Sequence, residues 1–208
     1  MLLGAVLAFA VLQPIKVLPR IRLAPGYALH DQHGDPLTSE TARGSITLYS
    51  FAPLDCGERC DDVFATLREV RERARTEVDL GDVDLQLVTV ALADDPTAEQ
   101  LAAAAAASGA DGEVWRWAGG DVDRIRTLVG AGFRRYVEFA PDGTVEFDPG
   151  FVLVDGAGVV RAELRYQTES PDADRLVRRL GVLGDELRLA HGPAAAAYEA
   201  AHLFLCYA

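Results

Sequence analysis

The chain has 208 residues, half of them hydrophobic, and a formal net charge of −12 at pH 7. This length suits one domain with a real hydrophobic core and additional segments at its ends. The negative charge, with Lys16 the only lysine among 20 basic residues, argues against nucleic-acid binding, which requires clustered basic side chains.

The first segment, residues 1–12, is apolar and is followed by a Gln-Pro pair and then by basic residues. It is shorter than an ordinary membrane-spanning helix and fits the core of a signal peptide. No Lys or Arg precedes this segment. If the sequence begins too late, it would therefore lack part of a longer anchor with basic residues in front. We expect residues 1–24 to be a signal or anchor segment with its linker, which predicts an extracytoplasmic protein anchored on the periplasmic side of a bacterial membrane. The alternative is a helix packed on the domain.

A β-hairpin and a buried strand are predicted next. Tyr27 and Leu29 alternate along the chain before Asp and Gly residues at turn positions, which is typical of a hairpin that leads into a core strand. The apolar run of residues 45–51 is that strand. Hydrophobic residues then recur at helical spacing over residues 61–76, and two aspartates occupy the favourable first turn of this helix.

Two cysteines, Cys56 and Cys60, lie at the junction between this strand and this helix. A helix N-terminus has unpaired backbone N–H groups, which favour a thiolate. Helical positions i and i+4 are also close enough for a disulfide to close. The pair therefore indicates dithiol redox chemistry or the binding of a soft metal. A structural disulfide or two idle thiols are the alternative.

Four carboxylates surround the two thiols, with only Arg59 of opposite sign nearby. They belong to Asp55, Glu58, Asp61 and Asp62. Negative neighbours oppose thiolate formation and offset the effect of the helix terminus. Because strong oxidants depend on a stabilised thiolate, we expect a reducing or metal-binding dithiol.

The remaining elements alternate between strands and helices. We predict a strand at 83–92, a helix at 97–108, a strand at 115–117, a helix at 121–131, strands at 151–154 and 159–164, and a helix at 171–187. Helices between successive strands imply right-handed crossovers and a parallel sheet, to which hairpins add antiparallel strands. The predicted fold class is α/β and thioredoxin-like, with a central mixed β-sheet flanked by helices, an N-terminal β-hairpin and terminal helices.

Pro149 stands just before the strand at 151–154. The spacing is that of thiol-disulfide oxidoreductases resembling thioredoxin, in which this proline is cis and faces the cysteine pair. A cis X-Pro bond costs only about 1 kcal/mol relative to trans. This interpretation makes Pro149 a catalytic residue beside Cys56 and Cys60. In the alternative, it is a loop proline that ends the preceding segment.

The C-terminal residues 188–208 are predicted to form an apolar helix or tail beyond the thioredoxin-like domain of residues 25–187. His202 and Cys206 share a face of this helix, an arrangement that can bind metal. Packing on the domain or on a partner is the more common role of such a tail. His30 and His33 lie in a turn, where polar residues are ordinary.

One series of motifs runs through most of the chain, over roughly residues 25–185. It consists of Tyr27-x-Leu29-x-Asp31-x-x-Gly34-x-Pro36, Gly44, Phe51 with Cys56-x-x-x-Cys60, Leu85 to Val90, Trp117-x-Gly119 and Leu153-Val154-Asp155-x-x-Gly158. This order resembles the Sco/SenC family. The resemblance implies a thioredoxin-fold protein, usually tethered to a membrane, that binds copper and helps assemble the dinuclear copper centre of cytochrome c oxidase. It also implies two cysteine ligands, here Cys56 and Cys60, and one distant histidine.

The chain departs from the family at this histidine. Counted back from Gly158, its position is occupied by Phe147, and no histidine lies between His33 and His191. A pair of cysteines without histidine can hold Cu(I), which accepts low coordination by thiolates, but it is poorer for Cu(II). The resemblance thus implies copper, as Cu(I) rather than Cu(II), and a respiratory oxidase subunit or another copper or thiol protein as partner.

Two mechanisms follow from the resemblance. The first is delivery of Cu(I), and the second is reduction of a partner's disulfide. In the second, resemblance to thioredoxins implies that Cys56 attacks and Cys60 resolves the mixed disulfide. Only the second makes the protein an enzyme, a thiol-disulfide oxidoreductase. A general thioredoxin-like oxidoreductase without metal is the alternative, and a diverged domain that has lost both activities is a third hypothesis.

Overall fold

The computed structural model describes residues 15–165 and 172–204, so that residues 1–14 of the predicted anchor segment, and Cys206, lie outside it. The strands are β1 (Arg22–Leu23), β2 (Ala28–Asp31), β3 (Pro36–Thr38), β4 (Ile46–Ala52), β5 (Leu85–Ala91), β6 (Trp115–Gly119), β7 (Val137–Phe139), β8 (Val145–Phe147), β9 (Gly150–Val154) and β10 (Val159–Arg165). The α-helices are α2 (Asp61–Glu77), α3 (Ala98–Ser108), α4 (Val122–Arg126), α5 (Ala173–Leu189) and α6 (Ala195–Phe204). Shorter helical segments are the 3₁₀ turns η1 (Gly57–Cys60) and η3 (Gly192–Ala194) and the π-helical η2 (Thr127–Gly132).

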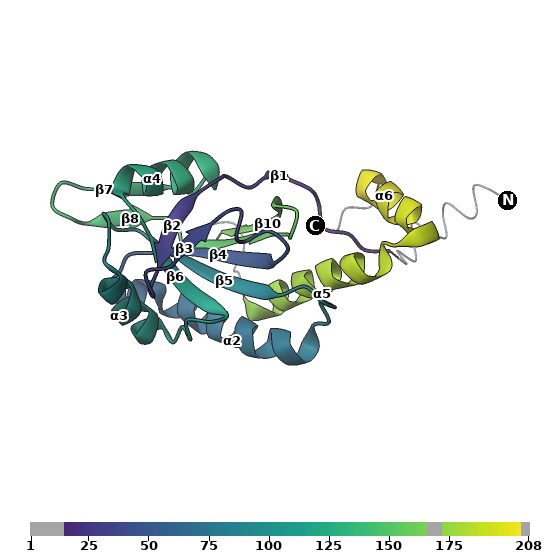
Figure 1. Ribbon diagram of the computed structural model, residues 1–208, viewed down its shortest axis with the longest axis horizontal. Coiled ribbons are helices and arrows are strands. Elements are labelled where there is room, and N and C mark those ends of the chain that lie inside the picture. The colour runs from purple at the N-terminus through teal and green to yellow at the C-terminus, as the bar shows by residue number, and fades with distance from the viewer. Residues whose placement is uncertain (1–14, 166–171, 205–208) are drawn as a thin grey trace.

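Eight strands form one mixed sheet in the order β1-β10-β9-β4-β5-β6-β2-β3 (Figure 1). Strands β4, β5 and β6 are parallel, and α2 and α3 connect them. Strands β9, β10 and β1 extend the sheet antiparallel on one side, and the β2–β3 hairpin extends it antiparallel beyond β6. The predicted α/β fold with a mixed sheet and an N-terminal hairpin is thus confirmed.

The sheet is covered on both faces because its central strands alternate their side chains between two cores. Ile46 and Leu48 of β4 belong to one core, in which α2 and α5 pack side by side against the sheet (Figure 1). Tyr49 and Phe51 of the same strand belong to the other core, which includes Ile125 of α4. All seven residues of β4 are buried.

Three features differ from the sequence prediction. The helix expected at 121–131 is divided into α4 and η2, and the glycines Gly130 and Gly132 in its second half have poor helix propensity. The short strand β1 was not predicted. Nor was the β7–β8 hairpin, which forms a separate two-stranded sheet around residues 140–144.

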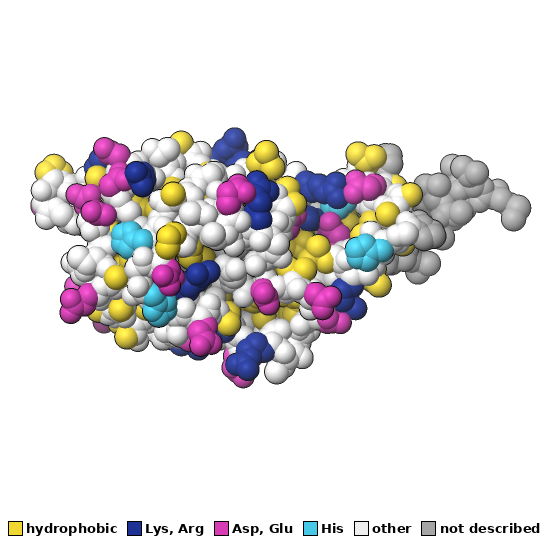
Figure 2. Space-filling model, viewed as in Figure 1, with side chains coloured by type: hydrophobic (Ala, Val, Ile, Leu, Met, Phe, Trp, Pro, Cys, Tyr) yellow, Lys and Arg dark blue, Asp and Glu magenta, His cyan; other side chains and the backbone are white. Residues whose placement is uncertain are grey.

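The surface carries charges of both signs. Figure 2 shows acidic and basic side chains interspersed over the visible face. Within the described ranges, no helix is both apolar and long enough to cross a membrane.

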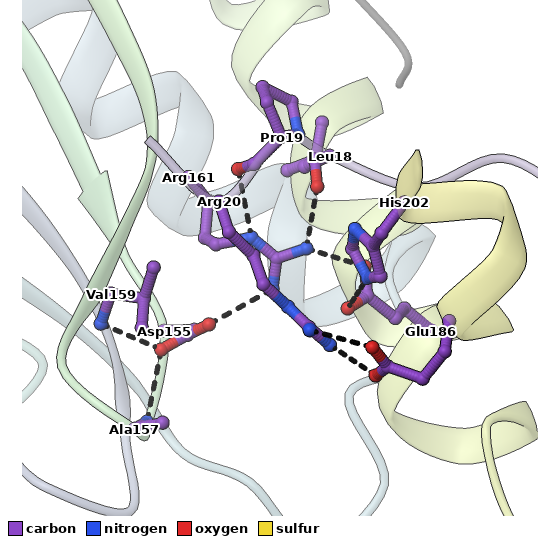
Figure 3. A network of polar contacts seen from close by, with 10 residues as sticks. Leu18, Pro19, Arg20, Asp155, Ala157, Val159, Arg161, Glu186 and His202 are labelled. Carbon is purple, nitrogen blue, oxygen red and sulfur yellow. Dashed lines mark hydrogen bonds and ion pairs between the residues drawn. The ribbon is translucent and has the colours of Figure 1, made fainter. Parts of the chain in front are cut away.

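A buried ionic network centred on Arg161 of β10 joins the sheet to the N-terminal linker (Figure 3). The guanidinium donates to the carboxylate of Asp155 at 2.9 Å and to that of Glu186, on α5, at 2.6 Å. It also donates to the backbone carbonyls of Leu18 and Pro19, at 2.8 and 3.2 Å. Each charged group in this network therefore has a partner of opposite sign, as burial requires.

The C-terminal helix α6 joins the same network. His202 Nε2 lies 2.9 Å from Glu186 Oε1, and Arg20 forms an ion pair with Glu199 at 2.6 Å. Apolar contacts add to these polar ones, through Val17, Tyr198 and Ala201. The tail thus packs on its own domain, while the predicted domain boundaries remain predictions.

The network generates a prediction about stability. Arg161→Leu leaves the carboxylates of Asp155 and Glu186 buried without their cation, so the free energy of unfolding should fall by roughly 3–5 kcal/mol in urea denaturation. Arg188→Leu is the control, because Arg188 pairs with Asp185 on the same helix at a more exposed position, where the expected loss is about 0–1 kcal/mol. Equal losses for the two variants would contradict this account.

Candidate dithiol site

Cys56 and Cys60 form a disulfide, with their Cα atoms 5.7 Å apart. Cys56 is the N-cap of η1 and Cys60 is the N-cap of α2, so the pair lies at the predicted junction between strand and helix. The four-residue spacing lets the disulfide close, as predicted, but a 3₁₀ turn, η1, rather than an α-helix connects the two cysteines. Gly57 begins this turn with φ of 53°, a conformation that side-chain-bearing residues rarely adopt.

The two cysteine residues differ in their exposure to solvent. Cys60 is fully buried, whereas Cys56 is 7% exposed. Both belong to an apolar cluster with Ala52, Leu101 and Trp117. Because thiol exchange requires an accessible sulfur, this difference supports the predicted order in which Cys56 reacts with a partner and Cys60 resolves.

The four carboxylates around the thiols are all exposed. Water and salt therefore screen their effect on a thiolate. Arg59, the cation between the cysteines, reaches away from this loop to the β7–β8 hairpin. Its Nη1 donates to the backbone carbonyl of Val145 at 3.2 Å, and its guanidinium carbon lies 5.7 Å from the centre of the Phe147 ring.

Phe147 is the residue at the position counted for the family histidine. It is partly buried and packs both against the apolar cluster that contains the two cysteines and against the core of Tyr49 and Phe51. A phenyl ring supplies no donor atom for a metal. The position is thus next to the cysteine cluster, but its side chain cannot be a third ligand.

The β7–β8 hairpin is the part of the site that sequence reasoning missed. Its signal is present in the chain, because Val-Glu-Phe occurs at both 137–139 and 145–147, around the turn-forming Pro141-Asp142-Gly143. Such alternation on both sides of a Pro-Asp-Gly turn is typical of a hairpin. The strands are only three residues long, which makes this signal weak.

Arg135 anchors the start of this hairpin to the central sheet. Its buried guanidinium donates to the carbonyls of Phe151 on β9 and Leu164 on β10, at 2.7 and 2.8 Å. Burial lowers the pKa of Arg135 to about 10, so the side chain is still a cation at neutral pH. The start of the hairpin is therefore fixed to the central sheet.

His30 and His33, the two histidines of the predicted turn, contact backbone carbonyls. His30 Nε2 is 2.7 Å from the carbonyl of Pro96, and His33 Nε2 is 3.3 Å from that of Gly112. In the part of the chain that the structure describes, no three His, Cys, Asp or Glu side chains are grouped to hold a metal. The structure thus brings together Cys56 and Cys60 as candidate ligands without a third.

Pro149 precedes β9 directly, as predicted, at a half-buried position. All described peptide bonds are trans, including the one between Asp148 and Pro149. The cis geometry expected of a thioredoxin-like proline is therefore not present. A catalytic role for Pro149 remains a prediction.

Comparison with known proteins gives a match to the model of the SCO1/SenC family over residues 17–181. Among solved structures, the chain is similar to a SCO1/SenC family lipoprotein from Bacillus anthracis str. Ames, with a TM-score of 0.67 and 20% identity over 77% of this chain and 94% of that one. It is also similar to BsSco, with a TM-score of 0.67 and 17% identity over 81% and 97% of the two chains. For copper-bound ScoI from Arabidopsis thaliana the TM-score is 0.63, with 16% identity over 76% and 98%. The search of curated protein sequences gives no match. The shared fold is thioredoxin-like.

The disulfide leads to a prediction about its linkage and reversibility. Closing a loop of about five residues restricts the unfolded chain, so reduction should lower the free energy of unfolding by roughly 2 kcal/mol. Urea denaturation of oxidised and reduced protein measures this difference, and Cys206→Ser is the control that should keep it. Mass spectrometry of the oxidised protein should show Cys56 linked to Cys60. A peptide that links either of them to Cys206 would refute the assignment.

Proposed function

Because the chain belongs to the SCO1/SenC family, we propose that it assists the assembly of the copper centre of cytochrome c oxidase through Cys56 and Cys60. The similar BsSco is described as a member of the Sco family of cytochrome c oxidase assembly proteins, and ScoI from Arabidopsis thaliana has been solved with copper bound. The observation that carries the proposal is the cysteine pair itself, enclosed in an apolar cluster where β4 meets α2.

Copper is the cargo in this proposal, and the residues present fit Cu(I). Thiolates are soft ligands, and Cu(I) accepts the low coordination that two sulfurs provide. The apolar cluster around Cys56 and Cys60 offers neither the imidazole nor the oxygen ligands that Cu(II) prefers. The pair is therefore suited to carry Cu(I) to an oxidase subunit or another copper protein.

Reduction of a partner's disulfide is the second mechanism, favoured by the disulfide that the pair forms. The Cys56 thiolate attacks one sulfur of the partner's disulfide, forming a mixed disulfide and releasing one partner thiolate. The Cys60 thiolate then attacks the Cys56 sulfur, which releases the second partner thiolate and forms the Cys56–Cys60 bond. The two electrons come from the dithiol, and a reductant of the thiol class must restore it. The same steps serve a general oxidoreductase without metal.

The proposed location is extracytoplasmic, on the periplasmic side of a bacterial membrane, with the N-terminal segment as the anchor. The apolar residues 1–12 and the basic residues after them support this location. One of the similar structures is a family lipoprotein. The proposed partner lies at the same membrane.

Cu(I) titration of the reduced protein tests the proposal. We expect stoichiometric binding in competition with a Cu(I) chelator, and its loss in both Cys56→Ser and Cys60→Ser, because a single thiolate provides too few ligands. Cys206→Ser should bind like the parent protein. If the parent protein retains no copper but reduces a disulfide-bonded peptide, the oxidoreductase alternative replaces the copper proposal.

Phe147→His tests the absent third ligand. Because Phe147 already packs against the cysteine cluster, an imidazole there should raise the Cu(II) affinity about tenfold or more, equivalent to roughly 1.4 kcal/mol. Phe139→His is the matched control, because Phe139 lies on the facing strand and packs against the core that it shares with Phe147 but not against the cysteine cluster. Spectroscopic Cu(II) titration measures both variants. No gain for Phe147→His, or an equal gain for the control, would show that this position does not face the metal site.

A further inference from the structure

The β7–β8 hairpin forms a sheet of its own beside α4 (Figure 1). Its position therefore depends on side-chain contacts rather than on pairing with the central sheet. The register places Phe147 opposite Val137 at the base of the hairpin and Phe139 opposite Val145 nearer the turn. Arg126 of α4 lies over the Phe139 ring, 5.1 Å from its centre.

Arg59 provides the corresponding contact at the base, and it comes from the loop between the cysteines. Arg59 lies in η1, three residues after Cys56, which is the N-cap of that turn. The guanidinium makes two contacts, both with β8: the hydrogen bond to the Val145 carbonyl and the cation–π contact with Phe147. The dithiol loop and the hairpin are thus joined by one side chain.

We infer that Arg59 is a positioning residue: it holds Phe147 against the cysteine cluster, so that the hairpin covers Cys56 until a partner displaces it. The small exposure of Cys56 and the packing of Phe147 against the cluster fit this cover. The inference rests on the proposed function, because copper transfer and disulfide exchange both require access to the Cys56 sulfur. The inference adds that Arg59 controls when the Cys56 sulfur becomes accessible to a partner.

The test is the second-order rate constant for reduction of the Cys56–Cys60 disulfide by dithiothreitol. A dithiothreitol thiolate attacks one sulfur and breaks the disulfide, and its second thiol completes the exchange, so the reagent ends as a cyclic disulfide and the protein as a dithiol. Arg59→Gln should raise this rate constant roughly threefold to tenfold, because both contacts with the hairpin are lost. Loss of a positive charge alone has the opposite effect, since it weakens the attraction of the anionic thiolate. The direction of the change therefore separates a cover from an electrostatic role.

Three further variants complete the experiment. Arg59→Lys keeps the charge but not the planar guanidinium, and Phe147→Leu keeps apolar volume but not the ring, so both should also accelerate reduction. Arg126→Gln removes a similar cation–π contact from the same hairpin without touching the dithiol loop, and its rate should stay within about twofold of the parent. Circular dichroism confirms that each variant is folded.

Each outcome decides between the two claims. An unchanged or slower rate for Arg59→Gln would overturn the inference, and so would an Arg126→Gln rate as fast as that of Arg59→Gln. Either of these outcomes would leave the proposed function intact, because the disulfide of the parent protein would still be reducible. A parent disulfide that dithiothreitol does not reduce would instead defeat the proposed function together with the inference.

Discussion

The central position of β4 is the constraint on which the dithiol depends. Parallel β5 on one side and antiparallel β9 on the other hold this strand, and every one of its residues is buried. A slip of one residue would break both ladders and exchange the side chains of the two cores. The end of β4 is therefore a fixed point, and Cys56 lies only four residues beyond Ala52, the last residue of the strand.

The hydrophobic pattern was sufficient to predict β4, α2 and the junction between them. Ile46 to Ala52 form a continuously buried strand of mostly apolar residues, and the residues after Cys60 follow the helical period. The pattern did not predict that η1 separates the two cysteines from the regular helix, because a 3₁₀ turn of four residues has no periodicity of its own. The order of elements and the location of the dithiol were thus predictable, but its local geometry was not.

The contacts of Arg59 show why the rest of the site required the structure. Its sequence neighbours are four carboxylates, whereas its hydrogen-bond partner Val145 is 86 residues away. Which of these groups the guanidinium reaches depends on how the hairpin packs, and hence on Arg135 and the central sheet. Similarly, the count from Gly158 identified Phe147 as the residue at the ligand position, but its packing against the cysteine cluster is a tertiary property.

The network around Arg161 also has a consequence for the reach of the protein. It fixes the N-terminal linker beside α6, at one end of the long axis of the molecule, whereas the β7–β8 hairpin lies at the other end (Figure 1). If the protein is anchored through its N-terminal segment, as proposed, a pull on that anchor would load this buried cluster rather than the β7–β8 hairpin. The domain would then act as a spacer between the anchor and the hairpin that packs beside the cysteine cluster.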